Sequence, residues 1–266
     1  MMSRAFASYA AIGDSFAEGL GGDRPDGSHR GWADLVAHGL VHASTTTVTH
    51  ANLAIRGKLL DPLLAEQLEP AITLRPELLS ISGGNNDIIR PTVSITANLA
   101  RLEVAIDRAV ESGIHVVFVT VANMTRHLPL GHVIETRGDR FALGIQKWDG
   151  KDNVTVVDNW FDETLYDLRF WAPDRLHLNT AGHLHAARKI PAALGVEVQQ
   201  TLDPVVEELR HRSSGVYWRE LVQPWIGRRV TGRSSGDGRR PKSPTMQPVV
   251  TRAGATTTGE IESWEI

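Results

Sequence analysis

Short apolar segments alternate with longer amphipathic segments over residues 8–190. Apolar or β-branched runs, which are typical of strands inside a sheet, occur at residues 8–12, 46–53, 78–81, 114–121 and 153–157. Apolar positions recur with helical spacing at residues 31–41, 58–68, 95–109, 132–148 and 179–190. This alternation predicts an α/β fold in which helices cover both faces of a mostly parallel sheet.

The pattern changes after this alternating region. Asp203 and Pro204 are a typical helix start. A further apolar stripe at helical spacing is formed by Trp218, Leu221, Val222 and Trp225. We predict that this amphipathic helix packs back onto the domain rather than docking on a membrane or a partner. Because Gly, Ser, Pro and Thr dominate thereafter, residues 1–226 are predicted to form the domain and residues 227–266 a basic, disordered tail.

The composition of the 266 residues narrows the chemistry. The chain has no Cys, which excludes disulfide frameworks, thiolate–zinc sites and cysteine nucleophiles, and suits a reducing compartment. Residues 1–11 contain a single Arg and no apolar run long enough for a signal peptide or a membrane span. We therefore expect a cytoplasmic protein.

Charge is distributed unevenly along the chain. Residues 1–226 carry a net charge of -6 and residues 227–266 a net charge of +3. Nucleic-acid binding needs a basic face, so the acidic main body argues against nucleic acid as a ligand. The basic tail could tether the domain to an anionic surface, but a terminus without a specific role is the simpler interpretation.

Motifs for nucleotides and metals are weak in this sequence. It contains no G-x-G-x-x-G, no G-x-x-x-x-G-K-[ST] and no H-E-x-x-H. His38 and His42 are four apart on a predicted helix, but no Glu follows His38. His183 and His185 are two apart and would face different ways on a helix. Packing or surface roles are predicted for these four histidines, with metal ligation as the weaker alternative.

Two polar stretches can form a nucleophilic site. Ser15 follows the first predicted strand directly, where ligands bind in open parallel sheets. A serine hydroxyl is a poor nucleophile until a base takes its proton. His177 can be that base if Asp174, three positions earlier, binds the other ring nitrogen and stabilises the imidazolium.

Two loops after the next predicted strands offer hydrogen-bond donors. Gly57 lies in the loop after the second strand, and Asn86 in the loop after the third. Acyl transfer develops negative charge on a carbonyl oxygen, which backbone N–H groups and an amide side chain can stabilise. Each element alone is a common turn or helix-start feature. Their order, each at a strand end or before the last helix, favours catalysis over structural roles.

These stretches resemble the sequence blocks of the SGNH hydrolases, also called GDSL esterases and lipases. The sequence GDSFAEG around Ser15 resembles the first block, and Gly57 matches the Gly of the second. The sequence GNND around Asn86 fits the third block, and DRLH, from Asp174 to His177, fits the last. The resemblance spans about residues 8–190.

The resemblance implies both a fold and a mechanism. The fold would be a flavodoxin-like three-layer α/β/α sandwich with a five-stranded parallel sheet. Ser15 would be the nucleophile of a triad with Asp174 and His177, and an acyl-serine would form without a metal or other cofactor. The oxyanion hole would consist of the Ser15 N–H, the Gly57 N–H and the Asn86 amide.

The sequence indicates the substrate less directly than the catalytic residues. Residues 21–31 and 123–132 should open on the same side as the nucleophile, and both segments are polar. We therefore favour a small-molecule ester with a short acyl chain over a long lipid, although these segments could equally be solvated loops. A thioesterase or acyltransferase would use the same residues, and a non-catalytic binding module on this fold is a further alternative. The sequence leaves the substrate-binding residues, partner proteins and oligomeric state open.

Overall fold

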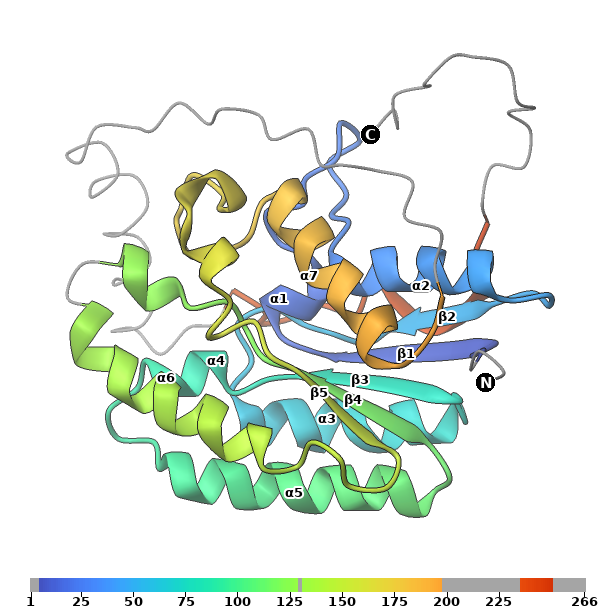
Figure 1. Cartoon of the computed structure of the whole chain (residues 1–266), viewed down its shortest axis with the longest axis horizontal. Coiled ribbons are helices and arrows are strands. Elements are labelled where there is room, and N and C mark those ends of the chain that lie inside the picture. Colours follow the sequence, from blue (N-terminus) through green and yellow to red (C-terminus); the bar gives the residue numbers. More distant parts are fainter. Residues whose placement is uncertain (1–4, 129–130, 198–234, 251–266) are drawn as a thin grey trace.

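Six strands form one sheet in the computed structural model of the chain, which describes residues 5–128, 131–197 and 235–250 (Figure 1). The strands are β1 (Ser8–Gly13), β2 (Thr49–Asn52), β3 (Leu78–Ser82), β4 (His115–Val119), β5 (Val154–Val157) and β6 (Ser243–Pro248). Their order across the sheet is β5-β4-β3-β1-β2-β6. The first five pair in parallel, and β6 pairs antiparallel with β2.

Helices cover both faces of this sheet. The α-helices are α1 (Ser15–Glu18), α2 (Trp32–Ala43), α3 (Leu60–Thr73), α4 (Asn85–Ile88), α5 (Ile95–Glu111), α6 (Gly131–Gln146) and α7 (Thr180–Ala193). Three short 3-10 helices are η1 (Met124–His127), η2 (Glu163–Tyr166) and η3 (Leu168–Phe170). Figure 1 shows α1, α2 and α7 on one face and α3, α5 and α6 on the other, which gives three layers.

The sheet forms the centre of the hydrophobic core. Every residue of β3 and β4 is buried, as expected for apolar strands covered on both faces. The order of the five parallel strands, 2-1-3-4-5 along the chain, is that of flavodoxin-like folds. The predicted α/β/α sandwich is therefore confirmed, and β6 adds one antiparallel strand to the predicted five.

The strand order also determines where a ligand can bind. The chain moves from β1 to one side of the sheet for β2 and then to the other side for β3. In open α/β sheets, the crevice outside the carboxyl ends of the strands at such a switch point is the usual binding site. Helix α1 begins directly after β1 and α4 directly after β3, so their first residues flank this crevice.

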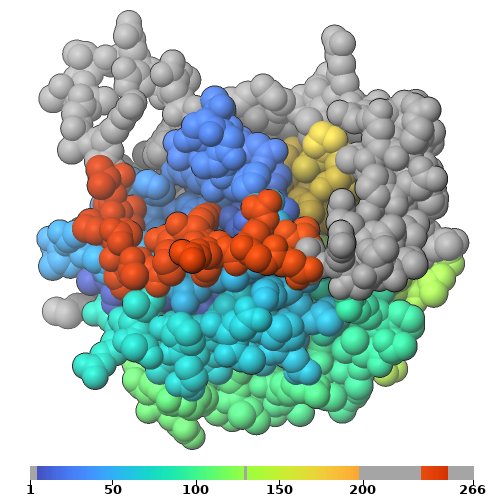
Figure 2. All heavy atoms as spheres, turned by 180° about the vertical axis from the view of Figure 1, so that it is seen from behind, coloured from blue at the N-terminus to red at the C-terminus, as the bar shows by residue number. Residues whose placement is uncertain are grey.

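The C-terminal part of the chain differs from the prediction. Residues 243–248 form β6, so a disordered tail is the wrong prediction for the described residues 235–250. Figure 2 shows this red segment as a band between the blue N-terminal segments and the cyan segments that follow β2. The predicted boundary after residue 226 and the predicted stripe from Trp218 to Trp225 lie outside the described residues. None of the described helices has the length and apolar character needed to cross a bilayer.

Candidate active site

Ser15 is the first residue of α1, directly after the turn that ends β1. Asp14 caps this helix, because its Oδ1 accepts the Phe16 N–H at 3.1 Å. A Cβ atom on Gly13 would lie 2.5 Å from the Ser82 carbonyl oxygen, so only glycine fits where β1 passes β3 into this turn. The Ser15 side chain is therefore presented at the carboxyl end of the sheet, and the residue is partly exposed.

The structure brings Ser15, His177 and Asp174 into one hydrogen-bonded chain. The Ser15 Oγ lies 3.1 Å from His177 Nε2, and His177 Nδ1 lies 2.6 Å from Asp174 Oδ2. Asp174 Oδ1 also accepts the backbone N–H groups of Leu176 and His177, both at 3.0 Å. The carboxylate thus orders its own turn while it orients the imidazole. The sequence-predicted spacing of three residues brings the pair together locally.

The electrostatics of the pair suit an imidazole that accepts a proton. Burial alone would lower the pKa of His177, but the adjacent Asp174 carboxylate outweighs burial and raises the pKa above its usual value. Burial would raise the pKa of Asp174, yet the charge and hydrogen bond of His177 keep that pKa below its usual value. The carboxylate therefore stays ionised and stabilises the protonated imidazole.

The two predicted oxyanion loops meet beside the start of α1. Gly57 has φ of 74°, a left-handed conformation that favours glycine. The Asn86 Nδ2 lies 3.0 Å from the Lys58 carbonyl oxygen and 3.3 Å from Asp14 Oδ2. The Asn86 amide therefore links the loop that contains Gly57 to the residue before Ser15. Ser15, Gly57 and Asn86 lie at one edge of the sheet.

Asp14 is a buried carboxyl group at the centre of this arrangement. Besides capping α1, it accepts hydrogen bonds from the side-chain amides of Asn85 and Asn86, each at 3.3 Å. Burial raises its pKa to about 7, against the hydrogen bond from the Phe16 N–H and the attraction of His177. Sequence reasoning gave Asp14 no role beyond the motif.

An ion pair between Glu18 and Arg56 connects α1 to the Gly57 loop. Glu18 Oε2 accepts the Arg56 backbone N–H at 2.7 Å, and Oε1 accepts the guanidinium Nε at 2.8 Å and also Nη2. Only 11% of the Glu18 side chain and 12% of the Arg56 side chain are exposed. Charge-assisted bonds of this kind are strong and directional. They fix Arg56, and with it the adjacent Gly57, relative to the helix that begins at Ser15.

Gln67 on α3, for which the sequence predicted no role in the site, holds the turn between β1 and α1. Its buried amide accepts the Gly13 N–H at 2.8 Å and donates to the Gly13 carbonyl oxygen at 3.0 Å. This pair of bonds satisfies both backbone groups of the residue before Asp14. A single glutamine in an otherwise apolar stripe of α3 is the sequence signal that could have suggested it.

Arg137 on α6 supports the loop after β3 in the same way. Its guanidinium donates to the backbone carbonyl oxygens of Ile88, Arg90 and Val93 at 2.7–2.8 Å. These carbonyl groups belong to the last residue of α4, the short helix that carries Asn86, and to the loop after it. The sequence offered no signal for this contact.

Two of the four histidines considered as metal ligands make other contacts. His183 is buried in the core, where its Nδ1 accepts the Trp32 N–H at 3.3 Å and its Nε2 donates to the Leu20 carbonyl oxygen at 2.9 Å. His185 Nε2 pairs with Asp162 Oδ2 at 2.9 Å. Among the described residues, no group of three or more His, Cys, Asp or Glu side chains is arranged to hold a metal ion. The alternative of a histidine metal site therefore receives no support from this part of the chain.

Side chains of the two polar segments predicted to open near the nucleophile make polar contacts. Asp23 Oδ1 lies 2.7 Å from His29 Nδ1. In the other segment, Arg126 pairs with Glu135 at 2.9 Å and lies over the Tyr166 ring at 4.5 Å from its centroid. Both segments remain candidates for the substrate-binding surface.

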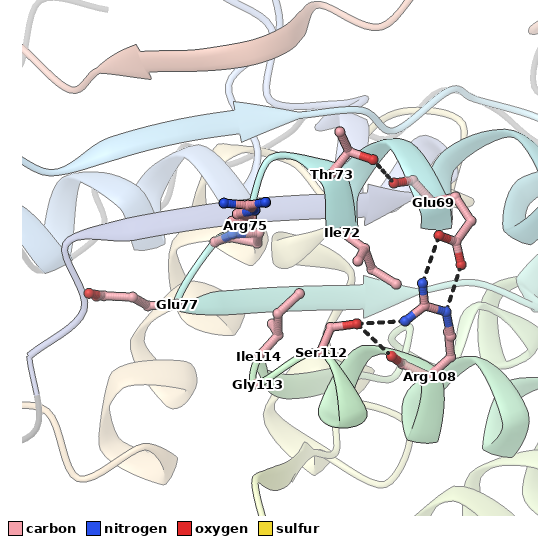
Figure 3. Close-up of a pocket in the computed structure, with 10 residues that line it drawn as sticks. Glu69, Ile72, Thr73, Arg75, Glu77, Arg108, Ser112, Gly113 and Ile114 are labelled. Carbon is pink, nitrogen blue, oxygen red and sulfur yellow. Dashed lines mark hydrogen bonds and ion pairs between the residues drawn. The ribbon is translucent and has the colours of Figure 1, made fainter.

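A cavity of about 540 Å³ opens at the opposite pole of the sheet (Figure 3). Its lining includes Glu77, which directly precedes β3, and Ile114, which directly precedes β4. Arg108 crosses one wall and donates to both carboxylate oxygens of Glu69, at 3.0 and 3.1 Å, and to Ser112 Oγ at 2.7 Å. The cavity lies at the amino ends of the strands and is therefore separate from the site at Ser15.

Comparison with known proteins gives one family match. A family model described as the GDSL-like Lipase/Acylhydrolase family matches residues 11–184, which include all five predicted site residues. No curated protein matches the chain.

Several solved structures share the fold. A catalytic mutant of Axe2, an acetylxylan esterase from Geobacillus stearothermophilus, is 22% identical with a TM-score of 0.61, over 75% of this chain and 100% of that one. A lipase/acylhydrolase from Enterococcus faecalis is 19% identical with a TM-score of 0.58, over 73% and 98%. The lipase Lip_vut3 from a goat rumen metagenome is 15% identical with a TM-score of 0.60, over 70% and 96%. At these identities the likeness shows a common architecture.

Proposed function

The chain belongs to the GDSL-like lipase/acylhydrolase family, and from this membership we propose that it is a serine esterase that cleaves short-chain carboxylic esters through an acyl-serine intermediate. As a member of the family, it is a hydrolase that acts on ester bonds. The observation that carries the finer proposal is the hydrogen-bonded chain from Ser15 Oγ through His177 to Asp174, with heavy-atom distances of 3.1 and 2.6 Å.

The first half of the reaction acylates the enzyme. As the Ser15 oxygen attacks the ester carbonyl carbon, its proton moves to His177 Nε2, and Asp174 stabilises the resulting imidazolium. The carbonyl oxygen becomes an oxyanion that accepts hydrogen bonds from the backbone N–H groups of Ser15 and Gly57 and from the Asn86 amide. The Asn86 amide has two N–H donors, so it exchanges one of its bonds to Lys58 and Asp14 for the bond to the oxyanion. When the carbon–oxygen bond to the alcohol breaks, His177 returns the proton to the leaving alkoxide.

The second half regenerates the serine. Water takes the place of the departed alcohol and gives a proton to His177 Nε2 as its oxygen attacks the acyl carbon. The same donors stabilise the second oxyanion. Collapse of this intermediate releases the carboxylic acid and returns the proton to Ser15. An alcohol or thiol acceptor in place of water would make the same residues an acyltransferase.

Support for a short acyl chain comes from the polarity of residues 21–31 and 123–132, which are expected to face the substrate. The Asp23–His29 pair and the Arg126–Glu135 pair put charged groups on the two segments expected to face the substrate. A long hydrocarbon chain would gain little from contact with such surfaces, because its binding depends on apolar area removed from water. The names of the structural relatives, an acetylxylan esterase and lipases, suggest which acyl lengths a test should span.

A substrate series with matched leaving groups tests the proposal. We would measure kcat/KM on p-nitrophenyl acetate, butyrate, octanoate and palmitate, and on acetyl and octanoyl thioesters, with product analysis in water and with added alcohol. We expect the highest kcat/KM on acetate or butyrate, the free acid as the main product, and no turnover above background in a folded Ser15→Ala variant. Full activity of Ser15→Ala would overturn the mechanism, and a preference for palmitate or for thioesters would overturn the substrate assignment.

The cytoplasmic location is also part of the proposal. It rests on the cysteine-free composition, which suits a reducing compartment. Fractionation of the source cells, with detection of the chain by antibody, tests it. Recovery of the chain outside the cytoplasmic fraction would contradict this location.

A further inference from the structure

Residues 235–250, here called the C-terminal strap, lie against the loops that build the candidate active site. They are outside residues 11–184, which the family model matches. Within the strap, β6 extends the sheet beside β2, and the Val249 N–H adds a bond to the Val48 carbonyl oxygen at 2.8 Å. Figure 2 shows the strap lying across the surface of the molecule.

Lys242, the residue before β6, joins three separate segments through one ammonium group. Its Nζ lies 2.7 Å from the Glu18 carbonyl oxygen, 3.3 Å from the His29 carbonyl oxygen and 2.6 Å from Asp34 Oδ2. Three acceptors around one nitrogen match the three N–H donors of an ammonium group. The last residue of α1, the polar segment after it and the first turn of α2 are thus held at one point.

The Asp34 carboxylate is built into this junction. Its Oδ2 also accepts the Gly31 N–H at 2.8 Å, and His50 Nε2 lies 3.8 Å from its Oδ1. Burial would raise the pKa of Asp34, but His50 and Lys242 together hold it well below its usual value. The aspartate therefore remains charged, and only 27% of the Lys242 side chain is exposed. An ion pair shielded to this degree is screened less by solvent than one on the open surface.

Glu18 connects this junction to the candidate oxyanion hole. Its backbone carbonyl accepts from Lys242, while its carboxylate holds the backbone and guanidinium of Arg56, the residue before Gly57. Movement of the end of α1 would therefore move the Gly57 loop as well. It would also move Ser15, which lies at the other end of the same four-residue helix.

A second contact of the strap reaches the same loop independently. Gly236 is buried against Arg56, and a Cβ atom at this position would lie 2.1 Å from the Arg56 carbonyl oxygen and 3.0 Å from Ile55 Cγ2. The strap backbone thus packs directly on this loop, which the Glu18 carboxylate also holds through its bonds to Arg56. Only glycine permits so close an approach here.

We propose that the C-terminal strap is a positioning element of the active site, with Lys242 and Gly236 as the positioning residues that fix α1 and the Arg56–Gly57 loop relative to each other. The inference rests on the proposed function, because what it fixes is the distance between the Ser15 nucleophile and the Gly57 oxyanion donor. Neither strap residue touches the substrate. The strap lowers the barrier by pre-ordering groups that act in the transition state.

Kinetics of the full-length chain test this inference. Lys242→Met removes the three-point contact, and Gly236→Ala pushes the strap away from Arg56 by a separate route. For each variant we expect kcat on the best ester of the series to fall about tenfold with KM nearly unchanged. A shift of about 1 Å at a reacting group costs on the order of 100-fold, and the loss of one of two strap contacts should shift Ser15 and Gly57 by less than that. Met246→Ala is the matched control, because Met246 lies on β6 and packs against the core but is not one of the residues proposed to position these loops. It should lower the melting temperature and leave kcat unchanged.

Hydrogen exchange gives a readout that does not depend on catalysis. We expect the amides of residues 15–20 and 53–58 to exchange faster in Lys242→Met and Gly236→Ala than in the wild type and Met246→Ala. Equal exchange in all four proteins overturns the inference whether or not the wild type hydrolyses esters. An inactive wild type would contradict the proposed function alone. An active wild type with unchanged kcat in both strap variants, or an equal loss of kcat in Met246→Ala, would show that the strap only stabilises the fold.

Discussion

His177 Nε2 lies 3.1 Å from Ser15 Oγ, although 162 positions separate the two residues. The sheet explains this proximity, because the turn after β1 and the loop before α7 both open at the carboxyl edge of the strands. Asp174, which is held by its own turn, binds Nδ1 and so orients the imidazole with Nε2 towards the serine. The proximity of residues 15 and 177 is consequently a property of the whole fold.

The elevated pKa of His177 determines the expected pH dependence of activity. The imidazole acts as a base only when it is neutral, so kcat/KM should rise with pH through a midpoint above 6.5, the usual value for histidine. Asp174→Asn removes the charge that raises this pKa, so its residual activity should rise with pH at a lower midpoint. Its kcat should also fall by about 10³–10⁴-fold, since the ring loses its orienting partner. A pH–rate series on both proteins checks this, and identical midpoints would contradict it.

The adjacent residues Asn85 and Asn86 provide an internal comparison for the oxyanion hole. Both amides bond Asp14, but only the Asn86 amide also reaches the Lys58 carbonyl oxygen beside Gly57. The second bond places the Asn86 amide beside Gly57, where it can exchange one of its two bonds for a bond to the oxyanion. Asn86→Ala should lower kcat by about 10²–10³-fold, the usual loss for one oxyanion donor. Asn85→Ala removes a buried hydrogen bond and should affect the melting temperature more than kcat. Single-turnover rates of the two variants show which asparagine is the oxyanion donor. A larger rate loss in Asn85→Ala would assign that role to Asn85.

Local patterns were sufficient to predict the framework of the molecule. The alternation of apolar runs and helical stripes predicted the five parallel strands and the long helices, because each pattern reflects which faces are buried. Ser15, Gly57, Asn86 and Asp174 could be chosen from their positions after strands or before the last helix. In a parallel sheet those positions converge at one edge, so sequence order carries information about space.

Such local patterns could not predict the contacts between segments that lie far apart in the sequence. Strand β6 has the sequence SPTMQP, with two prolines and no alternation, and it reads as a loop. It forms a strand because it pairs on one side only, with β2, and an edge strand tolerates proline where the missing N–H would face solvent. Gln67 interrupts an apolar stripe, but the side-chain pattern does not indicate which backbone groups Gln67 and Lys242 bind.

Replacement of Gln67 should show how much the turn before Ser15 depends on it. Gln67→Leu leaves the Gly13 N–H without its 2.8 Å acceptor inside the core. An unpaired buried polar group costs about 1–3 kcal/mol, so the free energy of unfolding should fall by that amount in urea titrations. Gln247→Leu is a suitable comparison, because Gln247 is exposed and its side chain bonds only Thr245 among the described residues. It should change stability by less than about 0.5 kcal/mol. Equal stability of the two variants would contradict a supporting role for Gln67.

His183 should make the folded state sensitive to mild acid. Burial lowers its pKa to about 4, whereas in the unfolded chain the ring titrates near 6.5. Between these values the unfolded state binds more protons, so the free energy of unfolding must fall as pH drops from about 6.5 towards 4, by up to about 1.4 kcal/mol per pH unit for this one group.

His183→Gln cannot titrate, so its stability should change less steeply in this range. At pH 8 it should already be weaker by about 1–3 kcal/mol, because one of the bonds to Trp32 and Leu20 is lost. His38 and His127, whose pKa values burial also lowers to about 4, contribute equally to both proteins. The difference between the two slopes in urea titrations from pH 5 to 8 therefore isolates His183, and parallel slopes would show that its burial does not govern acid sensitivity.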